Sequence, residues 1–414
     1  MANKDSIVCE YLQYTKENKE KYGEKTIVLL QVGSFFEAYG YQGEDGKICG
    51  SNVSDVFENI LEFKVNPKAK MFYEGKQVYM GGFGVAQIDK YITKIQENDY
   101  TIAVYVQKKN AINTTRSLVE IISPGTYFSD NKEKLSNITM CIWIQHVKSN
   151  RLTPEMMVFG VSTIDIYTGK TTVHQTDFFF HHNPTTYDSI ERLVSIYKPI
   201  ECIIISNVEE RITREIMMYI GIDDVKSHII DINSHEVLNS GKPKYQLEFF
   251  KRYYSEMCEE HISCKITESH DLGISSFVYL INFVSKHSPQ LTEKLVEPIF
   301  DDKTDELLLA NHSLKQLNIL DDNRHSGKLR SVGSFLDQCK TPMGRRRFIH
   351  NLHHPIKNIE KLNKSYEMTD LTICKEIWED YRNKLRNMSD LEKLKRKFIL
   401  NRITPKDISL FVRD

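Results

Sequence analysis

The stretch that most constrains the fold is Thr26–Val32 (TIVLLQV), a short and almost wholly apolar run that stops at Gly33. A run of this length that ends at a turn residue is typical of a buried β-strand. Phe35, Phe36 and Glu37 follow directly. Because side chains alternate between the two faces of an extended backbone, both phenylalanines cannot point inward. We expect one of them to face out, with Glu37 on the same face as Phe35.

An exposed aromatic beside a carboxylate is unusual on a DNA-binding surface, because the phosphates repel the carboxylate. The pair makes sense if the aromatic ring wedges between bases and the carboxylate, in a neutral or a charged form, reaches a base edge. The alternative is that both phenylalanines lie in the core and that Glu37 is a solvated turn residue. Taken alone, the pattern favours this alternative.

The rest of the first 130 residues predicts a mixed α/β domain. Asn66-Pro67 and Glu74-Gly75 are turn residues of the kind that hairpins and loops use. A helix is predicted next, because its apolar residues recur at helical spacing at Ile88, Tyr91, Ile92 and Ile95. Two strand-like runs follow at 101–106 and 118–122. The turn at Ser123-Pro124-Gly125 predicts a domain edge, so the first domain is placed at 1–130.

Beyond this edge the pattern predicts a second α/β domain and then a helical one. Strand-like runs occupy 141–147, 158–175 and 201–206, with a turn inside the second run and a helical stripe between the second and third. From about residue 270 helical spacing dominates, in stripes within 277–284, 307–320 and 391–398. We therefore predict a multidomain α/β plus α protein with domains at 1–130, 131–268 and 269–414.

Composition neither demands nor excludes a nucleic-acid partner. The net charge is −1, from 55 Lys+Arg and 56 Asp+Glu, so a DNA-binding surface would need local clustering of positive charge. The eight cysteines show no CxxC spacing. No signal-peptide core is visible, and no apolar run approaches the roughly 20 residues of a membrane span. We expect an intracellular, soluble protein with free thiols in a reducing compartment.

The stretch GSFFEAYG (33–40), with the strand before it, resembles the mismatch-binding domain of the MutS family, whose signature is Gly-Asp-Phe-Tyr-Glu after the same strand. In that family the phenylalanine stacks on the mispaired base from the minor groove, and the glutamate hydrogen-bonds to that base. The resemblance assigns these roles to Phe35 and Glu37, with Gly33 and Phe36 in the same DNA-binding motif. Ser34 and Phe36 depart from the family's Asp and Tyr, and neither change removes the pair.

The likeness continues along the chain in the family's order. It covers the rest of the mismatch-binding domain at 79–95 and 116–126, a ribonuclease-H-like connector at 161–170 and 198–206, and a helical core at 308–320, 334–355, 390–394 and 405–407. The departures are Tyr79 for a proline, Ala86 for a histidine and Asn351 for a tryptophan. Three stretches in one order indicate the family, whereas the subfamily stays open.

No nucleotide-binding P-loop is visible, since Gly169-Lys170-Thr171 lacks the earlier glycine and is predicted to be a hairpin turn. In the family, the ATPase with its ATP and Mg²⁺ is a C-terminal domain, which the resemblance places beyond Asp414. We therefore expect no cofactor and no enzymatic activity in these residues, and a chain that is either cut short or naturally split. The resemblance also implies double-stranded DNA with a mismatch or small loop as the partner, and a homodimer for the full-length protein.

Other charged and metal-ligating patterns are weaker. Cys258, His261 and Cys264 are spaced by three, but no fourth ligand stands near at a zinc-like spacing, so no metal site is predicted. The basic run at 393–397 is assigned to a solvated helix face. Arg346 matches a family position in the helical core, where we expect buried ion pairing.

The resulting interpretation is a protein that recognises mismatched or looped DNA, in which Phe35 unstacks a step and a mispaired step costs less to deform. One alternative is a nuclease built on the ribonuclease-H-like fold, which would need further carboxylates converging on Asp165. A lone strand carboxylate is more often structural or solvated. Another alternative is a relative devoted to recombination junctions or scaffolding, but such relatives lack the Phe-x-Glu pair.

Overall fold

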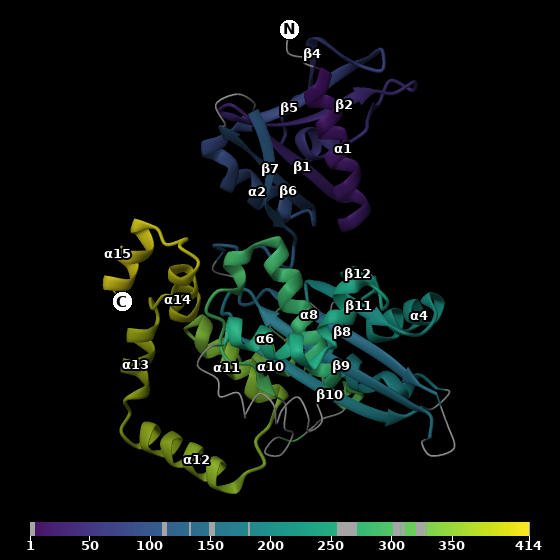
Figure 1. Cartoon of the computed structure of the whole chain (residues 1–414). Helices are drawn as coiled ribbons and strands as arrows, with labels where there is room; N and C mark the ends of the chain where they lie inside the picture. The colour runs from purple at the N-terminus through teal and green to yellow at the C-terminus, as the bar shows by residue number, and fades with distance from the viewer. Residues whose placement is uncertain are drawn as a thin grey trace. The chain divides into compact units, whose positions relative to one another are not determined.

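The computed structural model describes residues 5–109, 114–131, 134–148, 154–180, 183–254, 271–300, 307, 311–319, 327 and 329–413 (Figure 1). These residues form two compact units, Met1–Ser129 with Phe283–Pro289, and Asp130–Asn282 with Gln290–Asp414. The division predicted at residue 268 lies outside the described residues, so the three-domain organisation stays a prediction.

The first unit is built on a seven-stranded sheet with the order β4-β5-β2-β1-β6-β7, and β3 pairs with β2. β1 and β6 are parallel, and the other neighbouring strands are antiparallel. Its elements in chain order are α1 (Asp5–Tyr22), β1 (Thr26–Val32), β2 (Phe35–Gln42), β3 (Ile48–Cys49), a π-helix (Asp55–Ile60), β4 (Asn66–Tyr73), β5 (Lys76–Gly84), a 3-10 helix (Val85–Gln87), α2 (Ile88–Gln96), β6 (Thr101–Lys109) and β7 (Thr114–Ile122).

Most of the elements predicted for this unit are confirmed. β1 has the predicted bounds, α2 carries the predicted stripe, and Glu74-Gly75 forms the turn of the β4–β5 hairpin. The turn predicted at Asn66-Pro67 is wrong, because these residues begin β4. This strand lies at the edge of the sheet, where a proline without a backbone N–H is tolerated, and its register with β5 shifts between Pro67 and Phe72.

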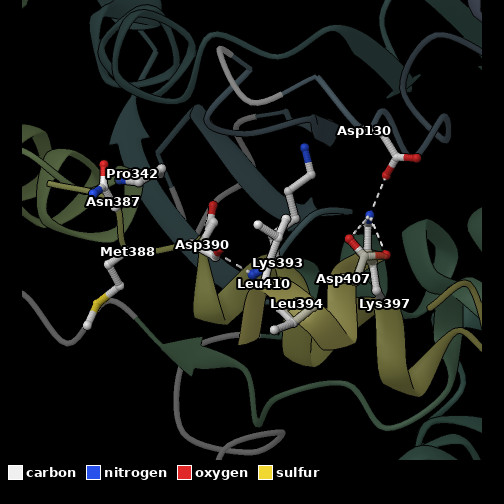
Figure 2. Close-up of a pocket in the computed structure, with 11 residues that line it drawn as sticks. Asp130, Pro342, Asn387, Met388, Asp390, Lys393, Leu394, Lys397, Asp407 and Leu410 are labelled. Carbon is white, nitrogen blue, oxygen red and sulfur yellow. Dashed lines mark hydrogen bonds and ion pairs between the residues drawn. The ribbon is translucent and has the colours of Figure 1, made fainter. Parts of the chain in front are cut away.

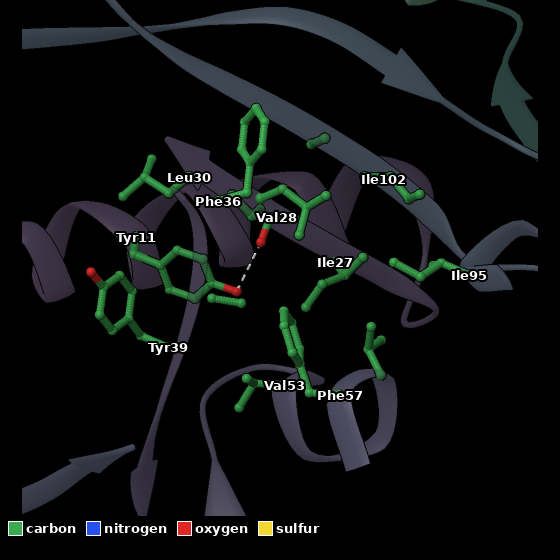
Figure 3. Packing of buried hydrophobic residues seen from close by; sticks show 14 of the residues in the cluster. Tyr11, Ile27, Val28, Leu30, Phe36, Tyr39, Val53, Phe57, Ile95 and Ile102 are labelled. Atoms are coloured by element: carbon green, nitrogen blue, oxygen red, sulfur yellow. Dashed lines mark hydrogen bonds between the residues drawn. The ribbon is translucent and has the colours of Figure 1, made fainter. Parts of the chain in front are cut away.

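Aromatic side chains pack on both faces of this sheet. Tyr11 of α1 lies edge-on to Tyr39 of β2, with ring centroids 5.4 Å apart. Its hydroxyl donates a hydrogen bond to the Val28 carbonyl at 3.1 Å (Figure 3). On the opposite face, Phe36 packs against Phe83 of β5 at 6.3 Å between centroids. Since β2 is covered on both sides along most of its length, its exposed first residue stands out.

The second unit is built on a six-stranded sheet with the order β12-β11-β8-β9-β10-β13. β8, β9 and β10 are antiparallel neighbours, whereas β11 is parallel to both β8 and β12. The sheet and its early helices comprise β8 (Ile138–Val147), β9 (Met156–Asp165), β10 (Thr171–Phe179), a 3-10 helix (Pro184–Tyr187), α3 (Asp188–Tyr197), β11 (Glu201–Ser206), α4 (Glu210–Ile220), β12 (Lys226–Asp231), α5 (His235–Ser240), α6 (Pro243–Tyr253), α8 (Asp271–His287), a 3-10 helix (Pro289–Thr292) and β13 (Ile299–Phe300).

The described part of the last third is mostly helical, as predicted. Its helices are α9 (Asn311–Gln316), α10 (Val332–Leu336), α11 (Pro342–His353), α12 (Ile359–Cys374), α13 (Trp378–Leu385), α14 (Leu391–Ile399) and α15 (Pro405–Arg413). Two details differ from the prediction. The short strand β13 pairs with β10, and the helix expected within 307–320 covers only α9 among the residues described there.

Helix α8 lies close to β8 and β9 of this sheet (Figure 1). The approach leaves no room for a side chain at Gly160 on β9. A Cβ atom at Gly160 would overlap the Leu272 carbonyl group and lie 2.8 Å from the Gly273 nitrogen. We expect Gly160→Ala to lower the free energy of unfolding by roughly 2–3 kcal/mol, because two backbones would have to move apart.

Urea unfolding of the variant and of a control measures this effect. Gly241→Ala is a suitable control, since the nearest atom to its added Cβ is 3.9 Å away. If the two variants unfolded at the same urea concentration, the close approach of α8 to β9 would be contradicted.

In the basic run on α14 only Lys395 is exposed, so the prediction of a solvated helix face is wrong for Lys393, Arg396 and Lys397. Lys393 Nζ donates a hydrogen bond to the Asn131 carbonyl at 3.0 Å and lies 4.1 Å from the centre of the Tyr167 ring. Burial lowers the pKa of Lys393 to about 8. Arg396 is only 1% exposed and donates to the carbonyls of Leu291 and Glu293. These cations turn inward because carbonyl oxygens and an aromatic ring offer them partners.

Lys397 completes this inward face. Its Nζ lies 2.7 Å from Asp130 Oδ1 and 3.0 Å from Asp407 Oδ1, beside a pocket that Lys393 also lines (Figure 2). Of the predicted apolar stripe, Leu394 is buried, whereas Leu391 and Phe398 are exposed. The helix exists as predicted, but the side that it buries carries three cations beside Leu394.

Candidate nucleic-acid interface

The turn between β1 and β2 presents the first residue of β2 at the end of the sheet. Val32 and Phe35 pair across a two-residue loop, and Gly33, its first residue, has φ +60°. Glycine is the residue that adopts this conformation without strain, as a type II′ hairpin turn requires. The Gly33 N–H donates to Gln107 Oε1 at 3.1 Å, and the Ser34 carbonyl accepts from the Val85 N–H at 2.9 Å. The loop is therefore fixed from both sides.

Phe35 and Phe36 lie in opposite environments, as strand alternation predicts. Phe35 is 53% exposed, whereas Phe36 is 3% exposed in the core. Phe35 pairs in register with Gly84 of β5. A Cβ atom at Gly33 or at Gly84 would meet no heavy atom within 4 Å, so there is open space at both of these neighbours of Phe35.

Glu37 is buried, which differs from both sequence interpretations. Only 9% of the residue is exposed, so it is neither an exposed partner of Phe35 nor a solvated turn residue. Its Oε2 atom accepts a hydrogen bond from the Tyr39 hydroxyl and another from Lys68 Nζ at 2.7 Å. Burial, and then the bond to Glu37, raise the pKa of Tyr39, which therefore remains a donor. Glu37 shares its face of β2 with Phe35 and Tyr39 but lies under Lys68.

Two glycines of β5 make room for this arrangement. Gly82 pairs with Glu37, and an added Cβ there would lie 3.0 Å from the Phe36 carbonyl oxygen and 3.3 Å from Glu37 Cγ. Gly81 faces the other side, where a Cβ would lie 2.6 Å from the Phe57 ring. A side chain at Gly82 would displace β2 or the Glu37 side chain, and one at Gly81 would displace the Phe57 ring.

Sequence reasoning missed Lys68, Tyr39 and Gly82. Tyr39 could have been found, because residues two apart on a strand share a face. Gly82 carried a weaker signal in the Gly81-Gly82 pair, since glycine inside a strand often marks a close approach. Nothing in the sequence pointed from Glu37 to Lys68, which lies 31 residues away on another strand.

Both carboxylate oxygens of Asp165 accept hydrogen bonds from residues in or near the turn that follows β9. Its Oδ1 accepts from the backbone N–H groups of Asn137 at 3.0 Å and Tyr167 at 3.1 Å, and its Oδ2 accepts from Thr168 Oγ1 at 2.8 Å. Burial raises the pKa of Asp165 against the effect of these bonds. Within the described ranges, no three metal-ligating side chains lie together. The convergence of carboxylates that a nuclease would need is therefore not found there.

The remaining sequence patterns have plain outcomes. Gly169, with φ +71°, forms the β9–β10 hairpin turn as predicted. Cys258, His261 and Cys264 lie outside the described residues, and the six cysteines within them are free. No helix in the described part of the chain has both the length and the apolar character to cross a membrane. Arg346 makes the predicted ion pair, with Asp390 and Glu392.

Comparison with known families gives two matches that agree with each other. Residues 11–131 match the model of MutS domain I, and residues 312–414 match the model of MutS domain III. The first match contains the β1–β2 turn and Phe35, Glu37 and Lys68.

Curated relatives match over almost the whole chain. A putative DNA mismatch repair protein mutS homolog of Acanthamoeba polyphaga mimivirus is 25% identical, over 97% of this chain and 38% of the relative. The DNA mismatch repair protein MutS of Caldanaerobacter subterraneus subsp. tengcongensis is also 25% identical, over 98% of this chain and 42% of the relative. The DNA mismatch repair protein MutS of Methanosarcina barkeri is 21% identical, over 97% of this chain and 42% of the relative. The chain thus spans about two-fifths of the length of these relatives. Two domain models and these matches in one order lead to one conclusion: the chain belongs to the MutS family.

Proposed function

We propose that this chain recognises mismatched or looped double-stranded DNA in DNA mismatch repair, with Phe35 as the wedge and Glu37 as the group that reads the base from the minor groove. The observation that carries the proposal is the exposed ring of Phe35 beside a fixed hairpin turn, with open space at the neighbouring Gly33 and Gly84. Family membership supports the same function, since the matched relatives are named as mismatch repair proteins.

Discrimination would come from the cost of deforming the duplex. A wedge that enters from the minor groove unstacks a base step and kinks the helix, and this costs a few kcal/mol. A mispaired step is already weakly stacked and paired, so it costs less to open. Phe36 would support Phe35 from the core, and Gly33 would set the angle of the turn.

Affinity for every duplex, matched or not, would come from local positive charge. The chain as a whole is nearly neutral, but Lys64 and Lys70 are exposed around β4, the strand that carries Lys68. Exposed lysines of this unit would contact phosphates and release counterions, which gives binding that weakens as salt rises.

The second unit would act as a connector and helical core. Three strands in parallel, β8, β11 and β12, continued by the antiparallel β9 and β10, support a ribonuclease-H-like connector. The helices from α9 onward support a core domain. In the complete protein, ATP and Mg²⁺ would bind an ATPase domain that is absent from these residues, and two copies would assemble as a dimer.

The central test is a binding competition between a mismatched and a matched duplex of otherwise identical sequence, measured on the complete gene product. We expect the mismatched duplex to bind more tightly. Equal affinities at every salt concentration would overturn the proposed function.

Glu37→Gln is expected to retain mismatch binding and to tighten binding to matched DNA by roughly fivefold at low salt. The amide keeps an oxygen acceptor for a base, while loss of the carboxylate removes repulsion and releases the charge of Lys68 for every duplex. Affinities for both duplexes at two salt concentrations measure the effect.

Glu44→Gln makes the same change of charge at an exposed residue of this unit and serves as the control. If Glu37→Gln weakened matched and mismatched binding alike, the carboxylate would serve the fold alone, and its reading role would be wrong.

A further inference from the structure

The two hydrogen bonds to Glu37 leave its two carboxylate oxygens unequal. Tyr39 and Lys68 both donate to Oε2, and Oε1 receives no hydrogen bond from the residues that the structure describes. The carboxylate therefore has one oxygen that is held by the protein and one that is available to another donor.

Lys68 is itself held in place. Its Nζ lies 2.7 Å from Glu37 Oε2 and 5.2 Å from the centre of the Tyr39 ring, and its side chain is 29% exposed. The side chain of Glu37 is 11% exposed. A carboxylate withdrawn from water to this extent needs a counter-charge or a full set of donors. Lys68 supplies the charge, and Tyr39 supplies the second donor.

A second cation, Arg116, acts electrostatically on Tyr39 but forms its hydrogen bonds with residues other than Glu37. The charge of Arg116 on β7 acts on Tyr39, where it opposes the rise in pKa. However, its guanidinium bonds to Glu10 Oε2 at 3.1 Å and to the Gln31 carbonyl at 3.0 Å. Lys68 is thus the cation that bonds directly to Glu37.

We propose that Lys68 is a positioning residue for the recognition of mismatched DNA. Its hydrogen bond to Oε2 holds the Glu37 side chain in the orientation in which Oε1 can accept a hydrogen bond from the base. Its positive charge also offsets the charge of the carboxylate when the DNA phosphates approach. This inference rests on the proposed function of Phe35 and Glu37. It makes Glu37 a hydrogen-bond acceptor whose orientation is set by its ion pair with Lys68. Without Lys68 the carboxylate keeps only the hydrogen bond from Tyr39, so it is less firmly oriented, and its unpaired charge repels every duplex.

The test is the ratio of mismatched to matched affinity in Lys68→Met, measured on the complete gene product. We expect this ratio to fall about tenfold, the size of one charge-assisted hydrogen bond. Lys68→Arg should restore most of it, because a guanidinium can also donate to Oε2. In a Glu37→Gln background, Lys68→Met should leave the ratio unchanged, since Lys68 acts through the carboxylate.

Lys70→Met is the matched control. It removes the same charge from the same strand, at an exposed residue, and methionine and lysine are both unbranched at Cβ. It should weaken both duplexes equally and keep the ratio. If Lys68→Met and Lys70→Met behaved alike, Lys68 would be a phosphate contact only and the inference would be overturned.

Two further measurements keep the outcomes separate. Thermal unfolding shows whether Lys68→Met is folded, and Lys68→Gln, which retains a donor but no charge, replaces it if it is not. Phe35→Ala tests the proposed function independently. If Phe35→Ala lowers the ratio and both neutral variants of Lys68 keep it, the inference alone fails. If Phe35→Ala keeps the ratio, the proposed function fails.

Discussion

Phe35→Ala should reduce the ratio of mismatched to matched affinity to about 1, while weak and salt-sensitive duplex binding remains. The phenyl ring is the wedge that inserts between neighbouring bases and stabilises the opened step, whereas the methyl group of alanine is too small to do so. Phosphate contacts are independent of sequence, so they continue to hold any duplex. Since the ring is more than half exposed, its loss should change the free energy of unfolding by no more than roughly 1 kcal/mol.

Phe72→Ala is a close control for this experiment. Phe72 lies on β4 of the same unit and is 52% exposed, against 53% for Phe35. Both variants remove an exposed ring of the same size, so only the position differs. A competition assay in which Phe35→Ala kept the wild-type ratio, or in which both variants lost it equally, would contradict the assignment of the wedge.

Local chemistry predicted that Phe35 and Phe36 would face opposite sides of a strand, whereas the resemblance to the family singled out Phe35 as the exposed one. A short apolar run that ends at a glycine predicted β1 with its bounds, and alternation along the next strand separated Phe35 from Phe36. Both arguments use only neighbours in the chain. The hairpin turns at Glu74-Gly75 and Thr168-Gly169 were predictable for the same reason.

Tertiary partners were not predictable in this way. The burial of Glu37 depends on Lys68, whose strand reaches it only through the order β4-β5-β2 and a shift in register after Pro67. The orientation of α14 was mispredicted because helical periodicity shows which residues share a face but not what covers that face. Here the cover consists of carbonyl oxygens, carboxylates and a tyrosine ring, so the helix turns Lys393 and Arg396 inward.

The ion-pair network around Arg346 should contribute strongly to the stability of the second unit. Its Nη2 lies 2.6 Å from both Asp390 Oδ1 and Glu392 Oε2, and its Nη1 donates to Asp390 Oδ2 at 2.7 Å and to the Leu135 carbonyl at 3.1 Å. Arg346→Met would leave the mostly buried Asp390 without its cationic partner, although Asp390 Oδ1 would still accept from the Lys393 backbone N–H at 3.2 Å. Glu392, which is one-third exposed, keeps Lys170 at 2.6 Å. We expect a loss of roughly 3 kcal/mol in the free energy of unfolding at pH 7, at the low end for a broken buried pair.

Arg347→Met is the control, because Arg347 is exposed on the same helix and loses the same charge. Such a surface change should stay within roughly 0.5 kcal/mol. Urea unfolding at pH 7 compares the two variants with the wild type. Equal stabilities for the two variants would show that the network around Arg346 contributes nothing beyond its net charge.

The pH dependence gives this prediction a second, independent readout. Burial alone would raise the pKa of Asp390 and of Glu392, but the Arg346 guanidinium, together with Lys170 at Glu392, holds both below their ordinary values. A carboxylate with a depressed folded-state pKa contributes stability above its unfolded pKa and loses that contribution as pH falls through the folded value. The difference between wild type and Arg346→Met should therefore be constant near neutral pH and should shrink below about pH 4, where the unfolded carboxylates gain protons. A difference that stayed constant down to pH 3 would mean that Arg346 stabilises the unit by packing of its alkyl chain and not by its charge.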